Sequence, residues 1–359
     1  MSLVTSREVV GLAGPVGGGP AGDGRRLRPG PAGVGGPRER PGAGDVLGDI
    51  GVFGLVDTNG NGLAGLSLDC NCNEQKSAWF EEMEWGYAES NGPATWHEKY
   101  PLAAGPRQSP VDLSSSTATQ EEDSNAKPLH RRYNPQTGCV LGNTGYGWKV
   151  QIAGPTTARK DDLMFWFSEL SGGPLASRYR LEQFHMHWGD CDNEGSEHTV
   201  DGQSYAGELH LVHWNCDKYN SFGEAASQPD GLAVLGVFLK VGEANKELLK
   251  VTDLMSQITH KGQHVDITGE VDPTNLLPAK SSYWTYLGSL TTPPCNESVI
   301  WIVFKEQLTV SQEQLEAMRG LRCYSEGEAC PCDELKGVLL KNFRPPLPLG
   351  NRRVRECRE

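Results

Sequence analysis

The sequence predicts a mainly β (α+β) protein whose folded part is a single domain, and three features of the chain support this fold class. From about Trp85 onward, short runs rich in β-branched and aromatic residues are separated by Gly, Pro and Asn turns. Segments with the apolar spacing of a helix are few. The 44 glycines and 23 prolines are unevenly spread, so the folded part must be shorter than the 359-residue chain.

Five runs are the best strand candidates, and two segments are the best helix candidates. The predicted strands cover residues 148–152, 179–185, 209–211, 232–239 and 299–304. The predicted helices cover residues 245–257 and 311–319. Ser311 precedes Gln312, Glu313 and Gln314, which is typical of a capped helix start.

Residues 1–82 are predicted to be a low-complexity extension without a fold of its own, preceding a domain at residues 83–355. Runs of Gly, Pro and Arg bury too little apolar surface to offset the entropy lost on ordering. Within the extension, the segment from Asp57 to Gly62 follows the first half of a calcium-binding loop. The position of the bidentate Glu is taken by Leu68, so we do not expect calcium binding there.

Composition excludes several classes of function. The net charge of −13 argues against a nucleic-acid-binding surface, which needs a basic excess. No stretch approaches the ~18–20 apolar residues of a membrane span, and the N-terminus lacks the pattern of a secretory signal. We therefore expect a cytoplasmic monomer, with mitochondrial import or secretion as alternatives; Glu8, Asp23 and Glu39 count against a transit peptide.

Three histidines indicate a catalytic metal site. His185 and His187 are one residue apart, so in a strand both side chains leave the same face, and a neighbouring strand could add His210. Gln183 and Glu208 each precede a histidine by two residues and could accept its second N–H. Three nitrogen ligands leave the fourth position of Zn²⁺ open to water. His213 is expected to face away.

A series of motifs resembles the α-class carbonic anhydrases, from about Trp85 to about Arg352. The segment at residues 294–305 and the pair Cys330 and Cys332 are most similar to cytosolic arthropod members. The motifs that carry the resemblance are Gln183-Phe184-His185-Met186-His187-Trp188-Gly189, Gly195-Ser196-Glu197-His198-Thr199-Val200-Asp201, Glu208-Leu209-His210-Leu211-Val212-His213-Trp214, Ser289-Leu290-Thr291-Thr292-Pro293-Pro294 and Asn342-Phe343-Arg344-Pro345-Pro346.

The resemblance implies a large, twisted, mostly antiparallel sheet with short peripheral helices. It also implies reversible hydration of carbon dioxide to bicarbonate by a zinc-bound hydroxide, and inhibition by sulfonamides. The zinc ligands would be His185, His187 and His210, with Gln183 and Glu208 orienting His185 and His210. Thr291 and Glu197 would orient the hydroxide. The implied cavity residues are Thr292 and Tyr87 on its polar side, and Val212, Val234, Leu290, Val299 and Trp301 in the carbon dioxide pocket.

The sequence departs from the family at three points. Tyr146 stands where fast members have a His that shuttles protons, and a phenol with a pKa near 10 matches the task poorly. Lys149 stands where Asn is common, and we expect it to disturb the local water network. Residues 101–107 lack the cysteine that pairs with the position of Cys295 in secreted relatives, which favours a reducing compartment.

Two alternative functions remain open. A non-catalytic, carbonic-anhydrase-related binding protein would keep the fold but lose a zinc ligand, whereas all three ligand positions are His here. A carbonic anhydrase with a mineral- or partner-binding tail would use the extension, which lacks a regular Gly-Asn repeat and a long acidic run.

Overall fold

The computed structural model describes residues 85–120, 127–152, 167–280, 282–331 and 333–357. All of them belong to the second of the two units into which the chain divides, Cys70–Glu359. The predicted extension at residues 1–82 and the partial calcium loop that begins at Asp57 lie outside the described residues.

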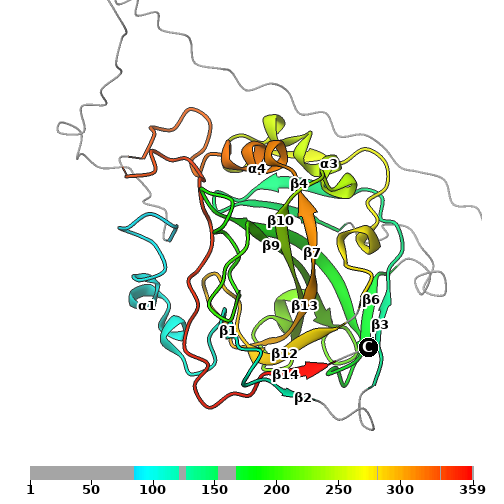
Figure 1. The fold of residues 1–359 in the computed structure, drawn as a ribbon. Coiled ribbons are helices and arrows are strands. Elements are labelled where there is room, and N and C mark those ends of the chain that lie inside the picture. Colours follow the sequence, from blue (N-terminus) through cyan, green and yellow to red (C-terminus); the bar gives the residue numbers. More distant parts are fainter. Residues whose placement is uncertain (1–84, 121–126, 153–166, 281, 332, 358–359) are drawn as a thin grey trace, which may run out of the picture. The chain divides into compact units, whose positions relative to one another are not determined.

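A large twisted sheet forms the centre of the domain (Figure 1). Its main path runs β11-β4-β5-β7-β9-β10-β13-β12-β14-β2, with β6 beside β7 and β3 beside β6. Most neighbours are antiparallel, but β10 pairs with β13 and β14 with β2 in parallel. The strands are β2 (Thr119–Gln120), β3 (Leu129–Arg132), β4 (Val140–Asn143), β5 (Trp148–Gln151), β6 (Glu169–Gly172), β7 (Tyr179–Trp188), β9 (Gly207–Asn215), β10 (Leu232–Val241), β11 (His264–Asp266), β12 (Tyr283–Gly288), β13 (Val299–Val310) and β14 (Arg355–Cys357).

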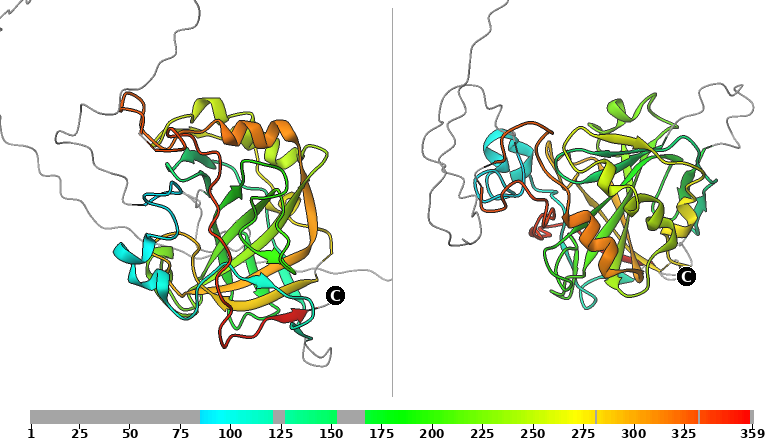
Figure 2. Two further views of the ribbon diagram at one scale, coloured as in Figure 1. Left: turned by 60° about the vertical axis from the view of Figure 1, so that its left-hand side comes forward. Right: turned by 90° about the horizontal axis from the view of Figure 1, so that it is seen from above.

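Short helices and a two-stranded sheet surround the central sheet (Figures 1 and 2). The small sheet pairs β1 (Asp112–Leu113) with β8 (Thr199–Val200). The α-helices in the described ranges are α1 (Trp96–Lys99), α2 (Phe222–Ala225), α3 (Lys246–Thr252) and α4 (Gln312–Arg319). The mainly β fold class and the mostly antiparallel sheet are therefore confirmed, and the parallel pairs make the sheet a mixed one.

The predicted elements are found close to their expected positions. All five predicted strands are present as β5, β7, β9, β10 and β13. The predicted helix at 245–257 is shorter, because α3 ends at Thr252 and a 3₁₀ turn follows at Met255–Gln257. Ser311 caps α4 in a reciprocal arrangement with Gln314, as predicted.

Two apolar clusters pack on opposite faces of the central strands. Alternate residues of β9 divide between them: Leu209 and Leu211 belong to the larger cluster, and Val212 and Trp214 to the smaller. Val234 on β10 and Trp301 on β13 also belong to the smaller cluster. Both faces of β9 are therefore covered, which explains why every residue of this strand is buried.

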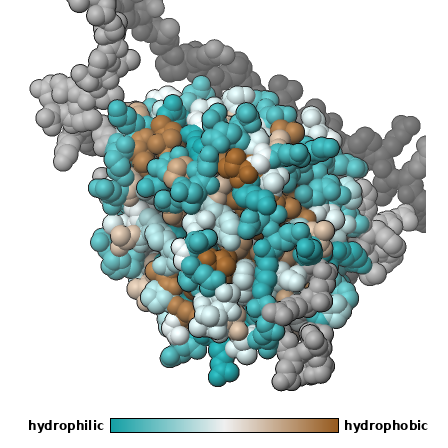
Figure 3. Space-filling model, viewed as in Figure 1, coloured by the Kyte–Doolittle hydropathy of each residue, from teal (hydrophilic) through white to brown (hydrophobic). Residues whose placement is uncertain are grey.

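The surface shows no single dominant apolar region on the face seen in Figure 3, where hydrophobic residues gather in several separate groups. The large hydrophobic side chains that are exposed within the described ranges are Leu102, Val241, Leu287 and Leu340. None of the helices in the described part of the chain has the length and apolar character needed to span a membrane.

Candidate metal centre

The pairing of β7 with β9 brings three imidazoles together. In this antiparallel pair His185 lies opposite His210, and His187 lies opposite Glu208. The ring centroids of His185 are 5.1 Å from those of His187 and 5.2 Å from those of His210, and the third distance is 4.7 Å. One nitrogen from each ring lies within 4.8 Å of the other two. The predicted trio is thus assembled from two adjacent strands.

Hydrogen bonds to the outer nitrogens fix which ring atom faces inward. His185 donates from Nδ1 to Oε1 of Gln183 at 2.9 Å, and His187 donates from Nδ1 to the carbonyl oxygen of Asn342 at 2.7 Å. His210 donates from Nε2 to Oε1 of Glu208 at 2.8 Å. Each ring therefore has one nitrogen free to bind a metal: Nε2 of His185 and of His187, and Nδ1 of His210.

One of these inward atoms supports a metal ion specifically. Nε2 of His187 is buried and has no hydrogen-bond partner in the part of the chain that the structure describes. A buried nitrogen lone pair without a partner is costly, so it calls for a ligand that accepts its electrons. Three neutral imidazoles around one point are a donor set that suits zinc and leaves a position open.

The imidazoles are held in the neutral form that binds metal. Burial and the neighbouring His210 lower the pKa of His187 to about 3. Burial also lowers the pKa of His185 well below its usual value, with further effects from His187 and His210. The pKa of His210 is lowered by burial as well, although Glu208 opposes this. A metal could therefore bind near neutral pH without displacing protons from these rings.

Glu208 ties the ligand strand to the loop that follows β7. Burial would raise the pKa of this carboxyl, but His198 and His210 hold it well below the usual range. Its oxygens accept bonds from His198 Nδ1 at 2.7 Å, His210 Nε2 at 2.8 Å, and the backbone N–H groups of Glu197 and His198 at 3.0 and 2.8 Å. Side chains of His198, Glu208 and His210 also lie close enough together to hold a metal ion, but their hydrogen bonds to one another explain this cluster without a second metal. Gly236 makes room for the carboxylate, because a Cβ there would lie 3.0 Å from Oε1.

Glu197 and Thr291 lie together beside the histidines. Glu197 is fully buried, and its Oε1 accepts the backbone N–H of Arg344 at 2.9 Å. The same oxygen lies 3.3 Å from Nδ1 of His187. Burial raises the pKa of Glu197 well above its usual value, while the Thr291 hydroxyl acts in the opposite direction. The predicted Thr–Glu pair is therefore adjacent and next to the predicted ligands.

Comparison with known proteins identifies the family. Residues 91–358 match the model of the eukaryotic-type carbonic anhydrases. The chain belongs to this family. It is 48% identical to Carbonic anhydrase 1 of Mus musculus over 273 residues, which cover 76% of this chain and 97% of the relative. The predicted carbonic anhydrase activity, the hydration of carbon dioxide, is thereby supported.

The apolar residues predicted for the substrate pocket of the carbonic anhydrase share one face of the sheet. Val212 pairs with Val234, and Val234 pairs with Trp301 on its other side. Val299 belongs to the same cluster, and Leu290 packs against it from the loop after β12. The Trp301 ring lies 4.8 Å from that of His210. The structure thus places all five side chains on the histidine side of the sheet.

Aromatic residues of the N-terminal segment lie against the Tyr146 loop and near Glu197. Tyr146 stacks on Trp85 with ring centroids 3.6 Å apart and planes 8° apart. The hydroxyl of Tyr87 is buried and has no hydrogen-bond partner among the described residues. Burial and the nearby Glu197 raise the pKa of Tyr87 well above its usual value. Thr292 is half-buried and accepts the N–H of Cys295 through its backbone oxygen at 2.9 Å.

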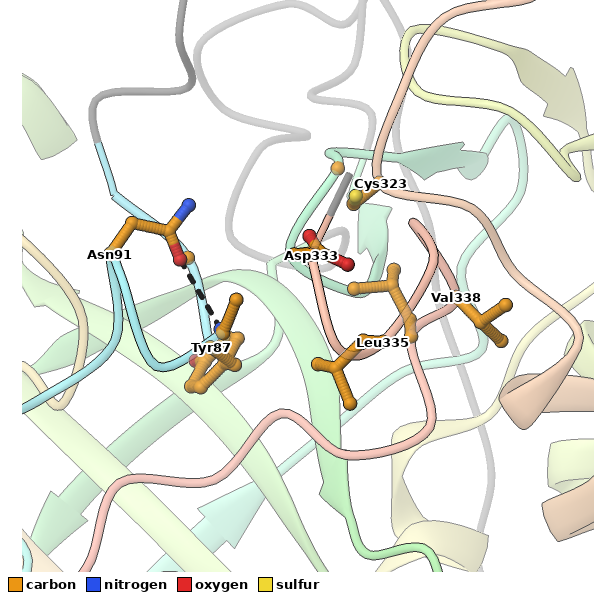
Figure 4. A pocket seen from close by; sticks show the side chains of 10 residues that line it. Tyr87, Asn91, Cys323, Asp333, Leu335 and Val338 are labelled. Carbon is orange, nitrogen blue, oxygen red and sulfur yellow. Dashed lines mark hydrogen bonds between the residues drawn. The ribbon is translucent and has the colours of Figure 1, made fainter. Parts of the chain in front are cut away.

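A shallow hollow lies beside Gly145 in the Tyr146 loop rather than at the three histidines. Tyr87 and Asn91 line it from the N-terminal segment, whereas Asp333, Leu335 and Val338 line it from the C-terminal region (Figure 4). It contains none of the predicted metal ligands. The metal centre is therefore defined by its side chains and not by this hollow.

Sequence reasoning missed two residues that complete the centre. Asn342 orients His187 through its carbonyl oxygen, and its amide also bonds Trp188 N, Tyr146 O and Met186 O. Arg344 positions Glu197 through its backbone N–H. Both belong to the motif at residues 342–346. This segment lies outside the strands that carry the histidines, so the side-chain alternation along those strands could not point to it.

Other sequence predictions concern residues outside the metal centre. His213 faces away from the three clustered histidines, as expected, and its Nε2 lies 2.8 Å from the hydroxyl of Tyr133. Cys295 is a free, buried cysteine, as expected from the missing partner. Burial raises the pKa of its thiol to about 11.

The metal-free protein should lose stability in mild acid because of these buried histidines. The folded pKa of His187 is about 3 and the unfolded value is about 6.5, so between these values the unfolded state binds more protons. Stability from this residue is therefore complete above pH 6.5 and falls as the pH decreases. From pH 7 to pH 5 the loss should be about 2 kcal/mol for His187 alone.

Urea unfolding of the metal-free protein at both pH values measures this loss. Relative to the parent protein, His187→Gln should show a smaller difference between pH 7 and pH 5. Replacing the exposed His264 by Gln is the matched control and should leave the difference unchanged. Equal pH dependence in both variants would contradict the assignment.

Proposed function

We propose that this carbonic anhydrase binds zinc through Nε2 of His185, Nε2 of His187 and Nδ1 of His210. The observation that carries the proposal is the convergence of three neutral imidazoles, one of which has a buried nitrogen without a partner. Zinc bound in such a site lowers the pKa of water to about 7, which supplies hydroxide as a nucleophile at neutral pH. Gln183, Asn342 and Glu208 would hold the rings in place.

Thr291 and Glu197 would orient the nucleophile toward the substrate. The Thr291 hydroxyl can donate its only hydrogen to the Glu197 carboxylate. Toward the nucleophile its oxygen can then act only as a hydrogen-bond acceptor. Arg344 already donates to Oε1 of Glu197, so Oε2 remains available for Thr291. Such fixed orientation lowers the barrier by removing unproductive arrangements before the reaction.

The apolar side chains beside the histidines would receive carbon dioxide, which has no charge and no net dipole. Val212, Val234 and Trp301 lie side by side on three neighbouring strands. Leu290 and Val299 extend the same surface. A neutral, apolar substrate loses little by leaving water for this surface, whereas water gains no hydrogen bonds there.

Tyr146 would replace the usual His in proton export, with a lower rate. A phenol near pKa 10 is a poor carrier between a donor near pKa 7 and buffer. Its stack on Trp85 would also restrict the movement of the ring. Thr292 and Tyr87 would complete the polar side of the cavity.

We propose a catalytic domain at residues 83–355, preceded by an extension, and a cytoplasmic monomer that resembles arthropod members. The free Cys295 is compatible with a reducing compartment. The complete set of three histidines with Thr291 and Glu197 favours catalysis over a binding role. A mineral- or partner-binding function of residues 1–82 would appear as a change of localisation, without a change of activity, when they are deleted.

Metal analysis and a carbon dioxide hydration assay test the zinc centre directly. The purified protein should contain stoichiometric zinc, and a sulfonamide should inhibit it. His187→Ala should remove most of the zinc and the activity, because a three-ligand site cannot lose one imidazole and keep its geometry. His213→Gln is the matched control, since His213 is buried on the same strand pair but faces away. Activity in metal-free protein would refute the proposal.

Tyr146→His should raise turnover under buffer-limited conditions. The reason is the closer match between an imidazole near pKa 6.5 and the proton donor. Turnover at low buffer should increase by about tenfold or more, within the range of general acid–base effects, while kcat/KM for carbon dioxide stays unchanged. Tyr133→Phe, at a tyrosine that bonds His213, is the control and should not change buffer dependence. No increase in Tyr146→His would show that Tyr146 is not at the limiting step.

Val234→Phe should block the substrate while zinc stays bound. The added ring would fill the surface between Val212 and Trp301, so kcat/KM should fall by about a hundredfold, equivalent to nearly 3 kcal/mol. Val237→Phe is the matched control, because Val237 lies on the same strand but in the cluster on the other face. Both variants should lose stability through overpacking. Normal turnover in Val234→Phe with intact zinc would assign Val234 to core packing alone.

A further inference from the structure

Lys149 lies on the histidine face of the sheet, directly beside one of the ligands. In the antiparallel pair of β5 and β7, Lys149 is opposite His185, and Gln151 is opposite Gln183. Residues directly opposite each other in such a pair share a face, with Cβ atoms about 4.5–5.5 Å apart. The alternate residues Trp148 and Val150 point the other way and are buried in the larger apolar cluster. The Lys149 side chain therefore leaves the sheet toward the metal centre.

Among the described residues, no carboxylate neutralises the charge of Lys149. No acidic side chain lies within ion-pair distance of its ammonium in the described ranges, and the side chain is only half-buried. Three other lysines are paired: Lys218 with Asp230, Lys250 with Glu247, and Lys305 with Glu356. The pKa of His185 is lowered mainly by burial and then by His187 and His210, and the charge of Lys149 lowers it further. This effect agrees with the position of Lys149 opposite His185.

We propose that Lys149 forms an anion-binding subsite on the wall of the metal centre, which recruits small monovalent anions such as bicarbonate. The subsite rests on the proposed function, because bicarbonate is an anion of that reaction. An ammonium group is a compact charge with three donors, and it attracts an anion without demanding a fixed geometry.

The charge of the whole chain makes such a local cation important. With a net charge of −13, the protein as a whole repels anions, so entry of an anion depends on the local field in the cavity. The apolar surface of Val212, Val234 and Trp301 on the other side offers no charge to an anion. Lys149 thus places an anion-attracting charge on one side of the histidines, and the apolar surface suited to an uncharged gas lies on their other side.

The test measures anion binding and does not depend on activity. Cobalt(II) replaces zinc in the purified protein, since its visible absorption reports ligands and that of zinc does not. Sodium thiocyanate is titrated into the parent protein, Lys149→Gln, Lys149→Arg and the control Lys240→Gln, which removes one exposed lysine on β10. Zinc content and urea unfolding of each variant confirm that the fold and the metal site are intact.

We expect the positive charge at position 149 to determine the affinity for thiocyanate. Lys149→Gln should raise the Kd for thiocyanate by about five- to tenfold, Lys149→Arg by less than about twofold, and Lys240→Gln not at all. The effect of Lys149→Gln should shrink with rising ionic strength. Unchanged binding in Lys149→Gln, equal losses in both Lys149 variants, or an equal loss in Lys240→Gln would each overturn the subsite. Failure of the parent protein to bind cobalt would instead refute the proposed metal centre.

Discussion

The register between β7 and β9 is the constraint on which the proposed metal centre depends. Side chains alternate between the two faces of a strand, so a slip of one residue would turn a whole set of side chains to the opposite face. Here His185 must lie opposite His210 for the rings to converge. Phe184 and Leu211, the sequence neighbours of these two histidines, point to the other face and are fully buried in the larger cluster. Any slip would expose them and is therefore costly. Apolar burial on one face thus determines the chemistry on the other.

Hydrogen bonds then convert this placement into fixed orientation. Each of the three clustered imidazoles is held by a different kind of acceptor: the Gln183 amide, the Asn342 backbone and the Glu208 carboxylate. Glu208 remains charged although it is buried, because its two oxygens accept hydrogen bonds from Glu197 N–H, His198 N–H, His198 Nδ1 and His210 Nε2. A network in which each member is satisfied favours one arrangement over its alternatives.

Local patterns predicted the parts of this structure that depend on neighbours in sequence. The alternation of His185 and His187 predicted their common face, and the Ser311–Gln314 pattern predicted the start of α4. The sequence could not predict the contacts of Asn342 and Arg344, because loop positions more than 140 residues from their partners follow no periodicity. Similarly, the Trp85–Tyr146 stack forms between two segments that are far apart in sequence and share no pattern that would pair them. Long-range closure is decided by packing, which a motif does not describe.

The position of Asn342 and Arg344, which follow β13 and α4 in the chain, affects when the proposed metal centre can form. These residues leave the ribosome after almost all of the sheet, and β14, which pairs with β12 and β2, follows them. Until then His187 lacks the acceptor for its Nδ1–H, and Glu197 lacks the donor to its Oε1. A chain that has not yet closed this segment onto β7 therefore carries three histidines without the contacts that orient His187 and Glu197, so docking of this segment and completion of the proposed metal site are coupled.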